Sequence, residues 1–195
     1  LAIIIKECIA MRKNFGVKSW FYPQPVLIIA TYDENGNPDA MNAAWGGLYD
    51  GNKVELCLSA GHKTTKNIRA VGAFTVSFAD AANLVASDYV GLASANTEPK
   101  KMEKSGFHLT KSQFVNAPLI DELPVAMECK LVKINEDGNV IGEIVNVSAD
   151  ESVLGEDGNI DFSKFHPISF EPVHNGYHVL GERVGNAFQD GAALK

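Results

Sequence analysis

The stretch that decides the fold begins with Asn42-Ala43-Ala44-Trp45-Gly46-Gly47 and ends with Ser59-Ala60-Gly61-His62-Lys63-Thr64-Thr65-Lys66-Asn67-Ile68-Arg69. Between these two parts lies an apolar run whose side chains alternate, which predicts a β-strand over residues 53–59. Small residues come first, where a flat molecule could lie against the backbone. Hydrogen-bonding side chains follow, where a strand is expected to lead into a helix. We hypothesise that the stretch holds a flat, phosphorylated ligand.

The second part has the features of a phosphate site. Residues 63–71 predict a short helix that stops at Gly72. The first N–H groups of a helix are unpaired and carry partial positive charge, so a phosphate is stabilised there. Lys63 adds a full charge, and the hydroxyls of Thr64 and Thr65 can donate hydrogen bonds. An ordinary helix start with solvated lysines explains the same residues, and neither a P-loop nor a GxGxxG motif is present to decide between them.

The first part allows two interpretations as well. Trp45 could form a wall against an aromatic ring. Alternatively, a strand ends here in a glycine turn and Trp45 fills the core. The segment Asp88-Tyr89-Val90-Gly91-Leu92-Ala93-Ser94 could border the same pocket, or it could be a capped helix that packs closely through Gly91.

The rest of the chain predicts a mostly β, single-domain protein. An Asn35-Gly36 turn joins two β-rich runs, and such a turn is a strong hairpin signal because both residues tolerate a positive φ. Further strands are expected at residues 74–78, 123–134, 140–148 and 168–172. Short helices are expected within residues 80–95 and 98–105. Asp80 and Asp88 are predicted to be N-caps in the first of these two segments. Hairpin-connected strands with a few helices indicate a small antiparallel barrel rather than a βαβ sheet. We expect one domain over residues 11–195, preceded by an extension, residues 1–10.

Composition narrows the class of protein. The chain has 195 residues, of which 46% are hydrophobic and 21% charged, and its formal net charge is −7. These values are typical of a globular protein, and the scattered basic residues argue against nucleic acid or a membrane as a partner. The three cysteines are far apart, which indicates a reducing, cytoplasmic compartment, and Cys57 is interpreted as a buried structural thiol. The histidines show no zinc spacing, and no Ser-His-Asp triad can be nominated.

Taken together, these motifs resemble the flavin reductase-like, FMN-binding split-barrel family, and most closely its flavoredoxin branch. The resemblance covers residues 11–188. It depends on the order and spacing of Pro25-Val26, the segment 42–46, the segment 62–68, the segment 88–94 and the tail 177–188. It implies a split β-barrel, a homodimer, and FMN bound non-covalently near the dimer interface.

The resemblance also implies which residues would bind the cofactor. The ring and ribityl chain would contact Asn42, Ala43, Ala44 and Trp45. The phosphate end would be held by Ser59, Lys63, Thr64, Thr65 and Asn67. His62 is also expected to bind the cofactor. Asp88, Tyr89 and Ser94 would border the flavin.

The expected activity is that of an NAD(P)H-dependent flavin or ferric reductase, with a redox protein as an alternative donor or acceptor. A pure electron carrier and a non-enzymatic flavin-binding module stay open. Because the flavin carries the redox chemistry, no acid–base residue is expected to be catalytic, and no metal is expected.

Overall fold

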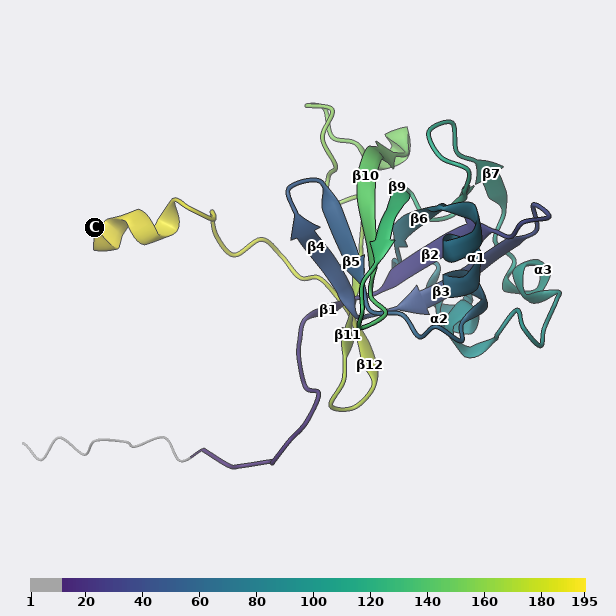
Figure 1. Cartoon of the computed structure of the whole chain (residues 1–195). Coiled ribbons are helices and arrows are strands. Elements are labelled where there is room, and N and C mark those ends of the chain that lie inside the picture. Colours follow the sequence, from purple (N-terminus) through teal and green to yellow (C-terminus); the bar gives the residue numbers. More distant parts are fainter. Residues whose placement is uncertain (1–11) are drawn as a thin grey trace, which may run out of the picture.

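The computed structural model describes residues 12–195, so the predicted extension at residues 1–10 lies outside the described residues. Figure 1 labels its elements. The strands are β1 (Gln24–Pro25), β2 (Leu27–Tyr32), β3 (Pro38–Ala43), β4 (Gly46–Asp50), β5 (Lys53–Leu56), β6 (Ala73–Phe78), β7 (Leu109–Lys111), β8 (Pro118–Ile120), β9 (Val125–Ile134), β10 (Val140–Ala149), β11 (Ile168–Glu171) and β12 (Gly176–Val179). The helices are α1 (Lys63–Val71), α2 (Leu84–Leu92) and α3 (Lys101–Ser105), with 3-10 turns at Glu151–Val153 and Asp190–Leu194.

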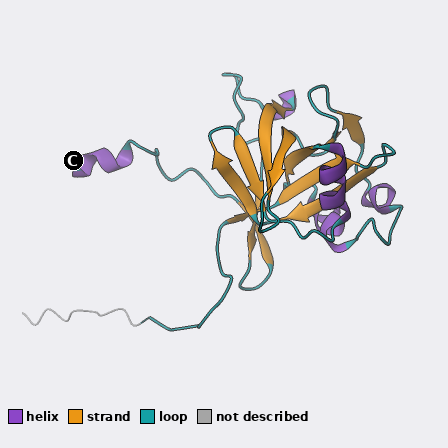
Figure 2. Cartoon of the chain, in the orientation of Figure 1, coloured by secondary structure: helices purple, strands orange, loops and turns teal. Residues whose placement is uncertain are grey.

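The strands form a curled sheet in which neighbours run antiparallel. Seven strands pair in the order β3-β2-β6-β9-β10-β5-β4, and β1-β11-β12 and β7-β8 form two smaller sheets. Figures 1 and 2 show α1, α2 and α3 together at the β2–β3 end of the sheet, whereas the C-terminal 3-10 turn lies apart from the strands. The prediction of a mostly β, antiparallel fold is therefore confirmed.

The hairpin between β2 and β3 forms where the Asn-Gly turn predicts it. Gly36 has φ 81°, which lies in the left-handed region that a glycine adopts at little cost. The Asp33 carboxylate accepts the N–H groups of Asn35 and Asn37, both at 2.9 Å, which closes the turn. The two strands then pair from Tyr32 with Pro38 to Leu27 with Ala43. This register brings Asn42 to the far end of the hairpin, next to the candidate site.

Strand β2 is buried on both of its faces, which explains its almost continuous run of apolar residues. Ile28 and Ala30 pack into one hydrophobic cluster with residues of α2 and α3. Leu27 and Ile29 pack into a second cluster, which includes Ile68 of α1 and residues of β5, β9 and β10. Helices α2 and α3 therefore pack against one face of β2, and α1 packs against the other.

The predicted helix at residues 63–71 is confirmed with the same bounds, and Gly72 ends it in the left-handed conformation, φ 73°. The prediction that Asp88 caps a helix was wrong, because Asp88 lies inside α2. The other predicted cap, Asp80, is not the N-cap either, since Asn83 occupies that position; Asp80 accepts the N–H of Asn83 at 2.9 Å.

Two further findings bear on the class of protein. Within the described residues, no helix combines the length and apolar character needed to cross a membrane. Nor do three His, Cys, Asp or Glu side chains gather anywhere in residues 12–195 as a metal ion would require.

Candidate functional site

Two cavities flank the short connection between β3 and β4. The first, which we call the helix-start cavity, has a volume of about 300 Å³ and includes Asn42, His62, Lys63, Thr64 and Ser94 in its wall. The second, the Trp45 cavity, has a volume of about 450 Å³ and includes Ala44, Trp45, Phe21, Glu55 and Cys57. Asn42 and Trp45 are three residues apart, so the chain separates them by at most about 11 Å. The walls of the two cavities therefore come close together at this connection.

The helix-start cavity brings together predicted residues from three separate segments. Asn42 comes from the end of β3, His62 and Lys63 from the start of α1, and Ser94 from the loop after α2. The Lys63 side chain is 31% exposed, and its Nζ lies 3.4 Å from an Asp33 carboxylate oxygen. The Lys63 ammonium therefore lines the cavity, and the Asp33 carboxylate partly neutralises its charge.

Helix α1 begins at this cavity without a side-chain cap. His62 occupies the N-cap position in an extended conformation, but its side chain accepts no hydrogen bond from the first turn, and the first turn has no acidic residue. Its carbonyl accepts the N–H of Lys66, which starts the helix ladder. The preceding N–H groups therefore still need acceptors, and an anion could provide them.

Three of the predicted phosphate residues are buried, and of these Thr64 lines the helix-start cavity whereas Thr65 and Asn67 do not. Thr64 donates its hydroxyl to Asp39 at 2.6 Å, and Asn67 donates its amide to the Thr31 hydroxyl at 3.0 Å. Thr65 is 1% exposed, and its hydroxyl has no hydrogen-bond partner within the described part of the chain. The Thr64 hydroxyl is donated to Asp39 here, and its predicted contact with a phosphate stays a prediction. The backbone N–H groups of this turn are not affected.

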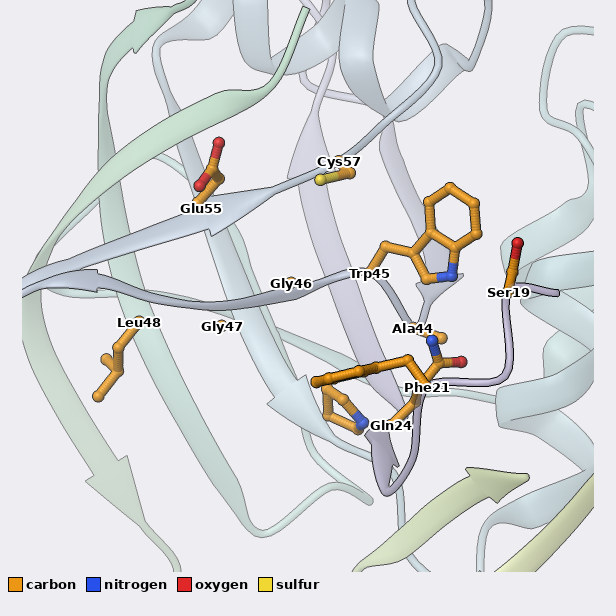
Figure 3. A pocket seen from close by; sticks show the side chains of 11 residues that line it. Ser19, Phe21, Gln24, Ala44, Trp45, Gly46, Gly47, Leu48, Glu55 and Cys57 are labelled. Carbon is orange, nitrogen blue, oxygen red and sulfur yellow. The ribbon is translucent and has the colours of Figure 1, made fainter. Parts of the chain in front are cut away.

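In the Trp45 cavity, the alternative that Trp45 fills the core was wrong. Trp45 is 58% exposed, and Figure 3 shows its indole at one end of the cavity with Ser19 and Phe21, while Leu48 and Glu55 lie toward the other end. Gly46 packs closely on the core, since a Cβ there would lie 2.7 Å from a methyl group of Leu56 and force it to shift. The cavity therefore presents an aromatic wall beside a glycine backbone that packs closely on the core.

The interpretation of Cys57 as a buried thiol was wrong. Val54, Leu56 and Leu58 are buried on one face of the β5 segment, and the alternation places Cys57 on the opposite face, where it is exposed and lines the Trp45 cavity. Its backbone N–H donates to the Trp45 carbonyl at 2.8 Å. Partial burial and the Glu55 carboxylate raise the pKa of the Cys57 thiol, so it is not an activated thiolate.

Helix α2 packs against the end of β3. A Cβ on Gly91 would lie 2.9 Å from the Cβ of Asn42, which confirms the expected close packing through this glycine. The Asn42 amide donates to the Ser87 carbonyl at 3.1 Å, which fixes its side chain. These contacts hold one wall of the helix-start cavity.

Asp88 lies on the same helix and accepts the hydroxyl of Tyr177 from β12 at 2.7 Å. Burial, followed by the Asp88 contact, raises the pKa of Tyr177 to about 12, so its hydroxyl stays protonated and can donate. This bond ties the tail of the chain to α2. Of the cavities described above, neither is lined by Asp88 or Tyr89, so their predicted contact with a ligand stays a prediction.

Four other predicted residues also lie outside the walls of both cavities: Ala43, Ser59, Thr65 and Asn67. Ala43 is half-buried and packs against the second core cluster, whereas Ser59 is exposed and its hydroxyl accepts the Gly61 N–H at 3.4 Å. Sequence reasoning missed Lys101 in the helix-start cavity and Phe21 in the Trp45 cavity. Lys101 stands next to Lys100, and no sequence pattern distinguishes it as a site residue. Phe21 does not belong to any predicted helix or strand.

Comparison with known proteins defines the class. A family model for the flavin reductase-like domain matches residues 19–169. The flavoredoxin of Desulfovibrio vulgaris is 35% identical, with a TM-score of 0.89, and the match covers 93% of this chain and 100% of that one. The FMN-binding domain of a flavin reductase-like enzyme from Shewanella baltica is 21% identical, with a TM-score of 0.74, over 84% of this chain and 89% of that one.

The fold class is therefore a split β-barrel, mostly β with a few short helices. The chain belongs to the flavin reductase-like domain family. An uncharacterised protein of Aquifex aeolicus is 34% identical over 74 residues, and this match spans 36% of the present chain and 38% of the Aquifex protein.

Proposed function

We propose that this protein is an FMN-binding oxidoreductase. It would move electrons from reduced nicotinamide or a protein donor, through non-covalently bound FMN, to a flavin, ferric or protein acceptor. The observation that carries this proposal is the uncapped start of α1, which faces a cavity lined by Lys63. Bound FMN would supply the redox chemistry, because its ring can take up and release electrons.

The residues present fit the two ends of this cofactor. At the phosphate end, free N–H groups of the first turn and the Lys63 ammonium are donors without a full set of acceptors among the described residues. Donors of this kind match a phosphate dianion. At the ring end, Trp45 and Phe21 supply aromatic surface, and Ala44 adds only a methyl group. Asn42 lies between the two ends and would contact the ribityl chain.

We also propose that the protein works as a homodimer. Residues 181–195 extend away from the barrel in Figure 1, and Val184, Phe188 and Leu194 on this tail are exposed at 101%, 107% and 94%. Strand β4 is the edge of the seven-stranded sheet, and Leu48 on it is 75% exposed. Exposed apolar side chains beside an unpaired sheet edge favour a partner that covers them. A second copy, related by a two-fold axis, would bury both features.

A pure electron carrier is a second candidate, which the similarity to a flavoredoxin favours. Protein loaded with FMN and mixed anaerobically with NADH or NADPH separates the two. We expect loss of the oxidised flavin absorbance within minutes if a nicotinamide is the donor. An unchanged spectrum over hours, in a sample that dithionite bleaches at once, would contradict the reductase and leave the carrier.

A further inference from the structure

A third cavity, which we call the Phe162 groove, has a volume of about 430 Å³. Its wall is formed almost entirely by apolar side chains of β1, β11 and the segment that precedes β11. Apart from Gln24 and Pro25, it shares no wall residue with the two cavities of the proposed flavin site. A concave apolar surface of this kind marks a place where a partner binds. The groove is therefore a separate surface, which the proposed flavin does not use.

Two aromatic rings form part of the groove. Phe162 and Phe165 both line it, and their ring centroids lie 6.2 Å apart at an interplanar angle of 47°. Phe165 is buried, whereas Phe162 is 63% exposed, so one side of this pair is open to solvent. A third aromatic ring could pack there edge-to-face, which is a favoured arrangement of aromatic side chains.

The C-terminal tail begins at the edge of the same groove. Leu180 lines the groove, and residues 181–195 then extend away from the barrel (Figure 1). Val184 and Phe188 are exposed at 101% and 107%, so nothing in residues 12–195 covers them. The tail is nevertheless folded locally, because the Asn186 N–H donates to the Asp190 carboxylate at 2.8 Å and a 3-10 turn follows. It is thus an ordered arm whose apolar side chains contact no surface of the described chain.

The backbone of the arm is strained at its largest apolar residue. Phe188 has φ 64°, which lies in the left-handed region that a bulky side chain disfavours. Such a conformation persists where surrounding contacts compensate for it. The exposed Phe188 ring supplies no compensating contact within the described residues. A surface that accepts this ring would supply one.

A second copy of the chain provides such a surface. Each copy has one Phe162 groove and one tail, so a two-fold axis lets the two tails exchange and leaves neither groove empty. Leu180 and Phe188 are eight residues apart, which lets Phe188 reach as far as about 28 Å from the edge of its own groove. That reach is enough for the tail to cross to a neighbouring barrel.

We propose that the tail of one copy docks in the Phe162 groove of the other, with Phe188 packed against Phe162. This inference rests on the proposed homodimer and is independent of FMN binding. It adds the place where the tail binds, and it makes the groove a binding site for a second copy of this chain.

Disulfide crosslinking of the Phe162→Cys/Phe188→Cys variant tests this contact in the full-length chain. Both side chains are more than half exposed in the single chain, so the variant should fold. After mild oxidation, we expect most chains to migrate at twice the monomer mass on a denaturing gel, and reductant should return them to the monomer mass. Val85→Cys/Phe188→Cys is the matched control, because Val85 is 83% exposed on α2, and it should stay at the monomer mass. The single Phe188→Cys variant measures any background from the exposed Cys57.

A second measurement needs no cysteine. Phe162→Asp places a charge in the groove, and we expect the dissociation constant of the dimer, measured by analytical ultracentrifugation, to rise about tenfold or more. Aromatic anchors carry much of the binding energy of an interface, which is the reason for this size of effect. Val85→Asp should leave the dissociation constant unchanged.

The outcomes separate this inference from the homodimer itself. A disulfide that forms within one chain, at the monomer mass, would show that the tail fills its own groove and would overturn the inference. A dimeric protein in which the cysteine pair does not crosslink, or in which Phe162→Asp has no effect, would also overturn it and leave the homodimer standing. A wild-type protein that is monomeric by light scattering would refute both, whatever its affinity for FMN.

Discussion

The Lys63→Glu variant is expected to bind FMN about thirtyfold more weakly than the wild-type protein, or worse. The change removes a charged donor, worth about 2 kcal/mol at a site of this kind, and puts a carboxylate where a phosphate is proposed to bind. Lys63 is the first residue of α1 and lines the helix-start cavity. A glutamate in the first turn favours the helix itself, so the fold should persist. Flavin fluorescence titration measures the affinity, and a thermal melt checks the fold.

The control for this variant is Arg69→Glu. Arg69 is exposed in the last turn of the same helix, so the net charge changes by the same amount at the opposite end. We expect its FMN affinity to stay within about twofold of the wild-type value, since exposed charges are screened over this distance. If Lys63→Glu bound FMN as tightly as Arg69→Glu, the start of α1 would not be the phosphate site.

The second large effect is expected from the tail. Replacing both Val184 and Phe188 with aspartate should convert the proposed homodimer to a monomer at micromolar concentration. Each aspartate would have to enter an apolar interface, and a buried unpaired charge costs several kcal/mol. Both wild-type side chains are fully exposed in the single chain, so the substitutions should not unfold the barrel. Light scattering coupled to size-exclusion chromatography gives the mass directly.

Val85→Asp serves as the control, because Val85 is 83% exposed at the start of α2, far along the chain from the tail. This variant should keep the mass of the wild-type protein. A wild-type protein that elutes with a monomer mass would refute the dimer. A dimeric Val184→Asp/Phe188→Asp variant would show that other surfaces hold the two copies together.

Much of the fold could be predicted because local chemistry and tertiary structure agree there. The Asn35-Gly36 turn and the Gly72 stop each require a glycine with a positive φ. The β2–β3 hairpin turns at Gly36 and helix α1 ends before Gly72, as predicted. Strand β4 was missed, because Gly46 and Gly47 are typical of a turn. Pairing with β5 and the close contact of Gly46 with Leu56 override that local preference.

The position of the site could be predicted from the sequence, but the set of side chains that line it could not. The segment around His62 and Lys63 does lie at a cavity, because a helix start is a local feature. Which side chains face that cavity depends on packing instead. Thr64 and Asn67 turn toward Asp39 and Thr31, which are more than twenty residues away in the chain. Lys101 enters the cavity from α3, and no spacing in the sequence relates it to α1.

The binding of FMN itself is the central claim, and one measurement tests it most directly. The purified protein is incubated with excess FMN, passed through a desalting column, and its absorption spectrum is recorded with the protein concentration. The account predicts about one flavin retained per chain, released unchanged when the protein is denatured because no covalent bond holds it. A colourless protein that also leaves FMN fluorescence unchanged in a titration would contradict the account.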